Sequence, residues 1–219
     1  MFSVIFEVRP KPDQWDAYFG IAGMLRAELE QVEGFLDNVR YRSLTREGWI
    51  LSLSSWRDEK AIVRWRSAAR HRLAQQRGRS DIFLDYRLRV GKTTRDTRGS
   101  EGSPFKERTL EAPECGAAVV LMEAKRPEAA RTGGDADWPG FEPRAAGLEG
   151  WDVFEAVLTP GDLILLTSWG ARADAEAFEN RVEPAQGARL RRVAIVRDYG
   201  LFDRAQAPQS YPSAPRHVS

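Results

Sequence analysis

The chain has 219 residues, of which 42% are hydrophobic and 30% are charged, and its formal net charge is +1. These values are typical of a soluble globular protein with one large or two small domains, and they do not favour binding to nucleic acid or to an anionic membrane. The single cysteine, Cys115, excludes an intramolecular disulfide and a cysteine-rich metal site. The sequence has no basic leader and no apolar stretch of the roughly 20 residues that a transmembrane helix needs, so we expect a cytoplasmic protein.

The first half of the chain has the periodicity of a βαββαβ unit. Alternating apolar residues predict strands, and apolar residues at helical spacing predict helices, with Asp13 and Asp58 at the two helix starts. The predicted strands cover 2–8, 35–44, 49–56 and 85–94, and the predicted helices cover 14–32 and 58–78. This order is that of the ferredoxin-like unit.

The second half repeats the first. The strand that ends in Ser55-Trp56 recurs as the strand that ends in Ser168-Trp169, and motifs before and after it recur in the same order. Ordered matches of this kind indicate one supersecondary unit used twice. The second copy is degenerate, because its second helix is shortened and because glycines and prolines interrupt residues 131–147. We expect residues 131–147 to be irregular and to line the mouth of a cavity.

These patterns predict an α+β fold in which two ferredoxin-like βαββαβ repeats pack as an intramolecular α+β barrel. A single sheet of this type has one face bare of helices, and its apolar residues must be buried against something. The predicted domains are residues 1–97 (first repeat), 98–113 (linker), 114–204 (second repeat) and 205–219 (irregular tail).

The first repeat resembles the antibiotic biosynthesis monooxygenase superfamily. The motifs that carry the resemblance are Phe6-Glu-Val-Arg-Pro-Lys-Pro12, Glu33-Gly-Phe35, Ser55-Trp-Arg-Asp-Glu59, Trp65 and His71-Arg72. The resemblance covers residues 1–95 well and residues 115–204 loosely. It implies a dimeric α+β barrel of ferredoxin-like units, and a family that holds cofactor-free oxygenases of aromatic substrates, haem-degrading monooxygenases and members of unknown activity.

The haem degraders of this superfamily carry an Asn on the first strand, and a Trp followed by a His on the second helix. Trp65 matches the family's Trp, whereas the His position falls on Gln75 and the Asn position falls near Glu7. His71 lies one turn before Gln75, and residues four apart share a helix face. Haem ligation by His71 therefore stays an open alternative.

His71 and Glu7 are the predicted catalytic residues. A neutral imidazole can serve as a general base or an axial ligand, although a solvated or capping histidine is the simpler reading of His71. A helix break at Ser67 would turn His71 inward. If the apolar neighbours of Glu7 pack under the helices, Glu7 faces the barrel interior, where burial would suit it to work as a base; an exposed glutamate is the alternative.

The predicted substrate-binding residues are mostly aromatic. They are Trp65, Gln75, Arg40, Trp138 and Trp151. Trp56 and Trp169 end equivalent strands and are expected to be core anchors. No nucleotide-binding or hydrolase motif occurs in the sequence.

The first functional hypothesis is therefore a monooxygenase that oxidises a small planar aromatic substrate with dioxygen in the barrel cavity, without a nucleotide cofactor or a metal. The alternatives are a haem-binding or haem-degrading monooxygenase and a non-catalytic protein that binds a hydrophobic ligand. The expected partner is a small hydrophobic or aromatic molecule, with a homodimer left open and with neither nucleic acid nor membrane as a partner.

Overall fold

The computed structural model describes residues 1–98, 116–126, 141, 143–182 and 187–208. They form two compact units that interleave along the chain. The first unit holds residues 1–40, 48–90 and those from 197 onward, and the second holds residues 41–47 and 91–196. The domains predicted from the sequence were drawn along the internal repeat and not along these units. Those boundaries stay a prediction.

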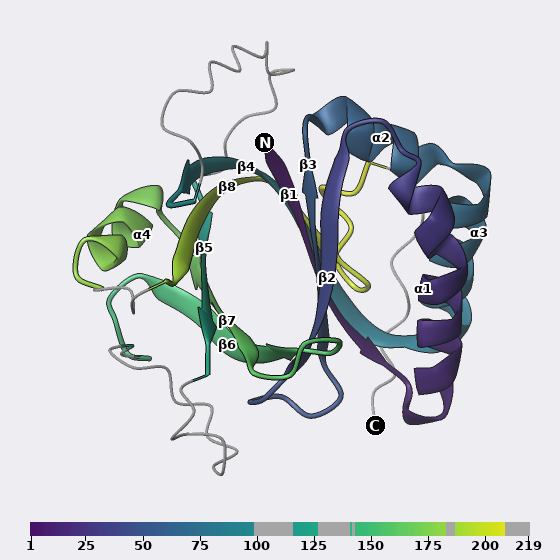
Figure 1. Ribbon diagram of the computed structural model, residues 1–219, viewed down its shortest axis with the longest axis horizontal. Coiled ribbons are helices and arrows are strands. Elements are labelled where there is room, and N and C mark those ends of the chain that lie inside the picture. The colour runs from purple at the N-terminus through teal and green to yellow at the C-terminus, as the bar shows by residue number, and fades with distance from the viewer. Residues whose placement is uncertain (99–115, 127–140, 142, 183–186, 209–219) are drawn as a thin grey trace. The chain divides into compact units, whose positions relative to one another are not determined.

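In the first unit, helices cover one face of an antiparallel sheet (Figure 1). The strands are β1 (Phe2–Pro10), β2 (Phe35–Ser43), β3 (Ile50–Trp56) and β4 (Phe83–Asp96), and the helices are α1 (Trp15–Glu30), α2 (Glu59–Ser67) and α3 (Ala69–Arg77). The strand order is β4-β1-β3-β2. The element order is the predicted βαββαβ, so this unit has the ferredoxin-like α+β arrangement.

The faces of this sheet follow from the pairing of β1 with β3. Phe2 lies opposite Trp56, and Phe6 lies opposite Ser52. Side chains alternate between the two faces of a strand. Phe2 and Phe6 therefore share a face, and both belong to apolar clusters that contain residues of the helices.

The two helix starts differ from each other. The Asp58 carboxylate accepts a hydrogen bond from the backbone N–H of Ala61 at 2.7 Å, so Asp58 caps α2 as predicted. The prediction that Asp13 caps the first helix is wrong. A 3-10 turn at Pro12–Gln14 (η1) precedes α1, and Gln14 is the residue at the cap. The fixed φ of Pro12 explains why the chain turns before the predicted start.

The helix predicted over residues 58–78 is two helices. Ala68 has φ −58° and ψ 134°, an extended conformation that ends α2 and lets α3 begin at Ala69. A π-helical turn at Gly78–Ile82 (η2) then leads into β4. The break redirects the side chains of α3, and this matters for the site described below.

The second unit contains the rest of the described secondary structure. Its elements are β5 (Ala118–Lys125), β6 (Leu148–Ala156), β7 (Asp162–Trp169), α4 (Arg172–Glu179) and the part of β8 (Arg189–Gly200) that precedes Arg197. β7 lies between β5 and β6, and β8 pairs with the other edge of β5. The prediction for residues 131–147 falls mainly outside the described residues.

Two features have the same register in both units. Trp56 Nε1 donates to Ser54 Oγ at 2.8 Å, and Trp169 Nε1 donates to Thr167 Oγ1 at 2.9 Å. Both tryptophans are 1% exposed, in agreement with the prediction that they are core anchors.

An ion pair that is buried in the first unit and partly buried in the second is the second shared feature. Phe2 lies opposite Trp56 as Ala118 lies opposite Trp169, so Glu7 on β1 and Glu123 on β5 occupy equivalent positions. The carboxylate of Glu7 pairs with Arg89, and that of Glu123 pairs with Arg191. That the two sheets face each other in one barrel stays a prediction. Among the described residues, no helix is long and apolar enough to cross a membrane.

Candidate functional site

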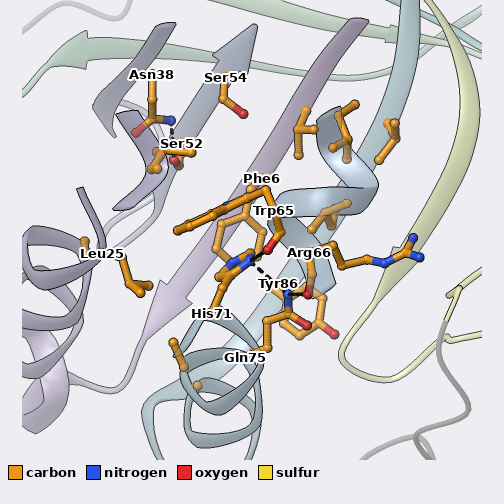
Figure 2. Close-up of a pocket in the computed structure, with 18 of the residues that line it drawn as sticks. Phe6, Leu25, Asn38, Ser52, Ser54, Trp65, Arg66, His71, Gln75 and Tyr86 are labelled. Carbon is orange, nitrogen blue, oxygen red and sulfur yellow. Dashed lines mark hydrogen bonds between the residues drawn. The ribbon is translucent and has the colours of Figure 1, made fainter. Parts of the chain in front are cut away.

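A cavity of about 240 Å³ lies in the first unit, between the sheet and the helices that cover it (Figure 2). The sequence predicted a cavity on the bare face of the sheet, whereas this cavity is on the helix-covered face. Its helical wall includes small residues, Ala22 on α1 and Ala74 on α3, followed by Gly78. Short side chains at these positions leave space that larger ones would fill.

The floor of the cavity is formed by the sheet. Phe6 lies in its centre, and Asn38, Ser52 and Ser54 add polar groups. Asn38 Nδ2 donates to Ser52 Oγ at 3.0 Å and to the Leu53 carbonyl at 3.2 Å. Because a hydroxyl can both accept and donate, the bonds accepted by Ser52 and Ser54 leave their hydroxyl hydrogens as donors for a ligand.

Trp65 and His71 form a stacked pair in the helical wall. Their ring centroids are 4.2 Å apart, and the planes are inclined by 16°. His71 Nδ1 lies 3.0 Å from the carbonyl oxygen of Trp65 (Figure 2). The break at Ala68 makes this contact possible, because it brings the start of α3 back toward the last turn of α2.

The surroundings of His71 fix its charge and its tautomer. Burial lowers the pKa of His71 from 6.5 to about 4, although the hydrogen bond to the Trp65 backbone acts in the opposite direction. The imidazole is therefore neutral near neutral pH. A carbonyl oxygen can only accept, so Nδ1 carries the proton and Nε2 carries the lone pair. Nε2 of His71 is thus a proton acceptor with no hydrogen-bond partner among the described residues.

Gln75 lies beside the ring of His71. Its amide nitrogen donates a hydrogen bond to the carbonyl oxygen of Arg66 at 3.4 Å and lies 3.2 Å from His71 Nδ1. With the proton on Nδ1 both of these nitrogens are donors, so their approach is a packing contact and not a hydrogen bond.

Charged residues in the cavity wall are mainly arginines. Arg40 lies beside the phenol of Tyr18; burial raises the pKa of Tyr18, and the guanidinium of Arg40 partly opposes this rise. Arg66 lies in the last turn of α2, next to Trp65. The Nε atoms of Arg40 and Arg66 are both buried without a hydrogen-bond partner in the part of the chain that the structure describes.

The structure brings four of the seven predicted site residues to the cavity. They are Arg40, Trp65, His71 and Gln75. Their predicted roles are not tested by this placement. Trp138 lies outside the described residues, and Trp151 packs against Phe141 in the core of the second unit.

Glu7 does not line the cavity. Its neighbour Phe6 does, so Glu7 points to the other face of the sheet, where it is 5% exposed and paired with Arg89. Of the two alternatives that the sequence left open for Glu7, burial and exposure, the structure shows burial. The buried side chain lies on the face of the sheet away from the cavity. An ionised partner beside it disfavours the proton uptake that a base needs.

Several cavity residues were not found from the sequence. Asn38, Ser52 and Ser54 could have been found from their period-two spacing on the two hairpin strands. Tyr199 and Arg204 had no local signal, because they lie at the end of the predicted second repeat and yet belong to the first unit. The described residues contain no group of three or more His, Cys, Asp or Glu that could hold a metal ion.

Comparison with known proteins places this chain among monooxygenase-like proteins. Residues 1–77 match the family described as Antibiotic biosynthesis monooxygenase. The protein called Jasmonate monooxygenase ABM from Pyricularia oryzae is 45% identical over 223 residues, which cover 98% of this chain and 100% of that protein.

Solved structures show likeness of fold at low identity. An aldoxime dehydratase in complex with butyraldoxime has a TM-score of 0.55 at 10% identity, over 94% of this chain and 80% of that one. A putative monooxygenase from Lactobacillus acidophilus has a TM-score of 0.41 at 8% identity, over 90% of this chain and 94% of that one. The extent and level of identity with the Pyricularia protein show the family: the chain belongs to the antibiotic biosynthesis monooxygenase family.

Proposed function

We propose that this protein is a monooxygenase that uses dioxygen to oxidise a small, largely apolar molecule of the jasmonate class in the cavity of the first unit. The observation that carries the proposal is the neutral His71, which is buried against Trp65 and has an unengaged Nε2. A relative of 45% identity named as a jasmonate monooxygenase supports this substrate class.

The size of the cavity supports a small ligand. At about 240 Å³ it exceeds the roughly 150 Å³ at which an engineered apolar cavity takes up benzene. It is smaller than the roughly 300–1,000 Å³ typical of pockets for drug-sized molecules. A ring with a short chain fits this range.

Haem fits this cavity poorly. The macrocycle is larger than most drug-sized ligands, whereas the cavity of about 240 Å³ is smaller than the pockets that hold such ligands. We therefore assign no step to haem, and the proposal is a reaction without a metal or a nucleotide cofactor.

The residues supply a base and donors for a developing negative charge. In the proposed reaction, His71 Nε2 removes a proton from a CH₂ group next to a substrate carbonyl. The hydroxyls of Ser52 and Ser54 donate to the carbonyl oxygen as charge accumulates there. The resulting carbanion supplies the electrons that reduce dioxygen, and a carbon–oxygen bond forms.

The peroxide that results loses water and leaves a new carbonyl where the CH₂ group stood. One oxygen atom of dioxygen remains in the product and the other leaves as water, with both hydrogens of the CH₂ group. The substrate provides all the electrons, so no external reductant is required. The apolar cavity limits access of water to the carbanion.

The test is oxidation of jasmonic acid by the purified protein. We expect consumption of dioxygen without an added cofactor, and isotopically labelled dioxygen should place one labelled atom in the product. His71→Gln should lower the rate by about 10²-fold or more, since this is the typical contribution of a positioned base. His217→Gln, which replaces the chain's other histidine, is the matched control and should keep the full rate.

Two results would count against the proposal. Full activity of the His71→Gln variant would show that His71 is not the base. Binding of jasmonic acid without incorporation of oxygen would favour the alternative of a protein that only binds a hydrophobic ligand.

A further inference from the structure

The charge on the cavity wall differs from that of the whole chain. The sequence has 33 basic and 32 acidic residues. Among the described residues that line the cavity, however, there are five arginines and a single glutamate, Glu59. A cavity lined by one sign of charge between apolar walls attracts ligands of the opposite sign. The cavity is therefore suited to an anion.

Most of these arginines gather at one end, around Tyr86 and Tyr199. Arg204 donates a hydrogen bond to the Tyr86 hydroxyl, and its guanidinium lies 5.5 Å from the centre of the Tyr199 ring. Burial raises the pKa of Tyr199, and Arg66, Arg204 and Arg197 each act against this rise, so all three lie near its phenol.

Arg66 stands out within this group. Arg197 has an acidic partner, Glu59, at 3.7 Å. Arg66 has no acidic partner among the described residues, and its Nε is buried without a hydrogen-bond partner. A half-buried guanidinium without a counter-charge is costly in the empty protein and becomes satisfied when a carboxylate binds.

The polar groups of the sheet lie elsewhere. In Figure 2, Asn38, Ser52 and Ser54 lie toward the top of the view, whereas Arg66, Tyr86 and His71 lie lower, beyond Phe6. The cavity thus has an arginine-rich end near the proposed base, an apolar middle around Phe6, and a neutral hydrogen-bonding end.

We propose that Arg66 binds the carboxylate of an apolar monocarboxylic acid, beside Arg204. This orients the body of the ligand over Phe6 and directs its uncharged polar end to Asn38 and Ser52. The jasmonate class of the acid rests on the function proposed above, whereas the preference for an anion rests only on the charges of the cavity. Arg66 is a specificity-determining residue in this arrangement.

Calorimetric titration with jasmonic acid and with its methyl ester tests the proposal. The two ligands share their apolar body and differ in charge. We expect the unmodified protein to bind the acid about tenfold or more tightly than the ester, since charge-assisted hydrogen bonds to an arginine are lost in the ester. Arg66→Met keeps much of the side-chain volume and should weaken binding of the acid about tenfold while changing that of the ester little.

Arg72→Met is the matched control. It removes the same charge from the exposed side of α3, outside the cavity wall, and should keep the preference for the acid. An unchanged preference in Arg66→Met would overturn the proposal. Loss of the preference in Arg40→Met but not in Arg66→Met would also overturn it, because the carboxylate would then bind at Arg40.

Two further variants test the proposal if the Arg66→Met protein binds neither the acid nor the ester. Arg66→Lys keeps the charge and should retain the preference for the acid, and Arg66→Gln should not; equal preferences in these two would refute the role of Arg66. The outcomes are separable from those for turnover. Tight binding of the acid without oxidation refutes the proposed function alone, and oxidation with no preference for the acid refutes this inference alone.

Discussion

His71 owes its properties to two residues, which contact one face of its ring and its Nδ1 atom. The Trp65 indole covers one face, the Trp65 carbonyl fixes the proton on Nδ1, and Gln75 lies within 3.2 Å of the same nitrogen. The stacking and the hydrogen bond to Trp65 hold the ring in one orientation. Burial keeps the ring neutral near neutral pH and lowers its basicity toward any proton donor, whether a bound molecule or solvent.

This environment has a measurable effect on stability. The pKa of His71 is about 4 in the folded protein and 6.5 for an ordinary histidine, as in the unfolded chain. Between these pH values the unfolded chain binds a proton that the folded protein does not. Protonation of His71 in the unfolded chain therefore lowers the free energy of unfolding as the pH falls from about 6.5 toward 4. The loss reaches up to about 3 kcal/mol, and above about pH 6.5 there is none.

Urea denaturation across this pH range measures the effect. His71→Gln has no group that titrates there, so the difference in unfolding free energy between the unmodified protein and the variant should narrow as the pH falls. Other groups titrate in both proteins and cancel in the difference. A constant difference from pH 6.5 to 4 would show that His71 is not held neutral.

At the scale of the elements, α2 positions much of the site, because both Trp65 and Arg66 lie in its last turn. Asp58 begins this helix by accepting the N–H of Ala61 at 2.7 Å. Asp58→Ala should lower the free energy of unfolding by about 1 kcal/mol, the usual cost of losing such a cap. Thermal or urea denaturation gives the value. Asp58→Ser, which can still accept the bond, should lose less; equal losses would mean that the cap contributes nothing.

The elements of the fold were largely predictable from the sequence, because hydrophobic periodicity depends on local burial. The strands, the first helix and the cap at Asp58 were found in this way. A break in the second helix was considered only as one possibility, at Ser67, because no glycine or proline marks a break there. The structure has the break at Ala68. The break decides where His71 points, so periodicity alone could not place the catalytic candidate.

The candidate site was less predictable than the fold. Arg40, Trp65, His71 and Gln75 were named from the sequence and do line the cavity. Their shared location depends on contacts between segments far apart in the chain, which a local pattern does not encode. The pairing of Glu7 with Arg89 is such a contact, and it explains why Glu7 was assigned to a site from which it is absent.

At the scale of the whole molecule, the first unit is completed by residues from the end of the chain. Leu201 is 3% exposed, packs in the cluster with Tyr18 and Tyr86, and donates its backbone N–H to the Tyr86 carbonyl at 3.2 Å. It therefore anchors the segment that carries Arg204. Leu201→Ala should cost about 2–5 kcal/mol, as is usual for a buried leucine.

The same substitution should weaken binding of an anionic ligand, because Arg204 loses its support. Denaturation and titration with jasmonic acid measure the two effects. Ala205→Ser, at an exposed position in the same segment, is the control and should change neither. A stable Leu201→Ala protein with full affinity would show that this segment is dispensable to the first unit.

The late arrival of this segment also has a consequence during synthesis on the ribosome. Strand β4 ends at Asp96, whereas the last part of the first unit begins at Arg197. At roughly 5–20 residues per second, about 5–20 s pass between the emergence of these two points. During that time the apolar surface that Tyr199 and Leu201 later cover stays open. The nascent chain therefore exposes this apolar surface until the segment from Arg197 has emerged.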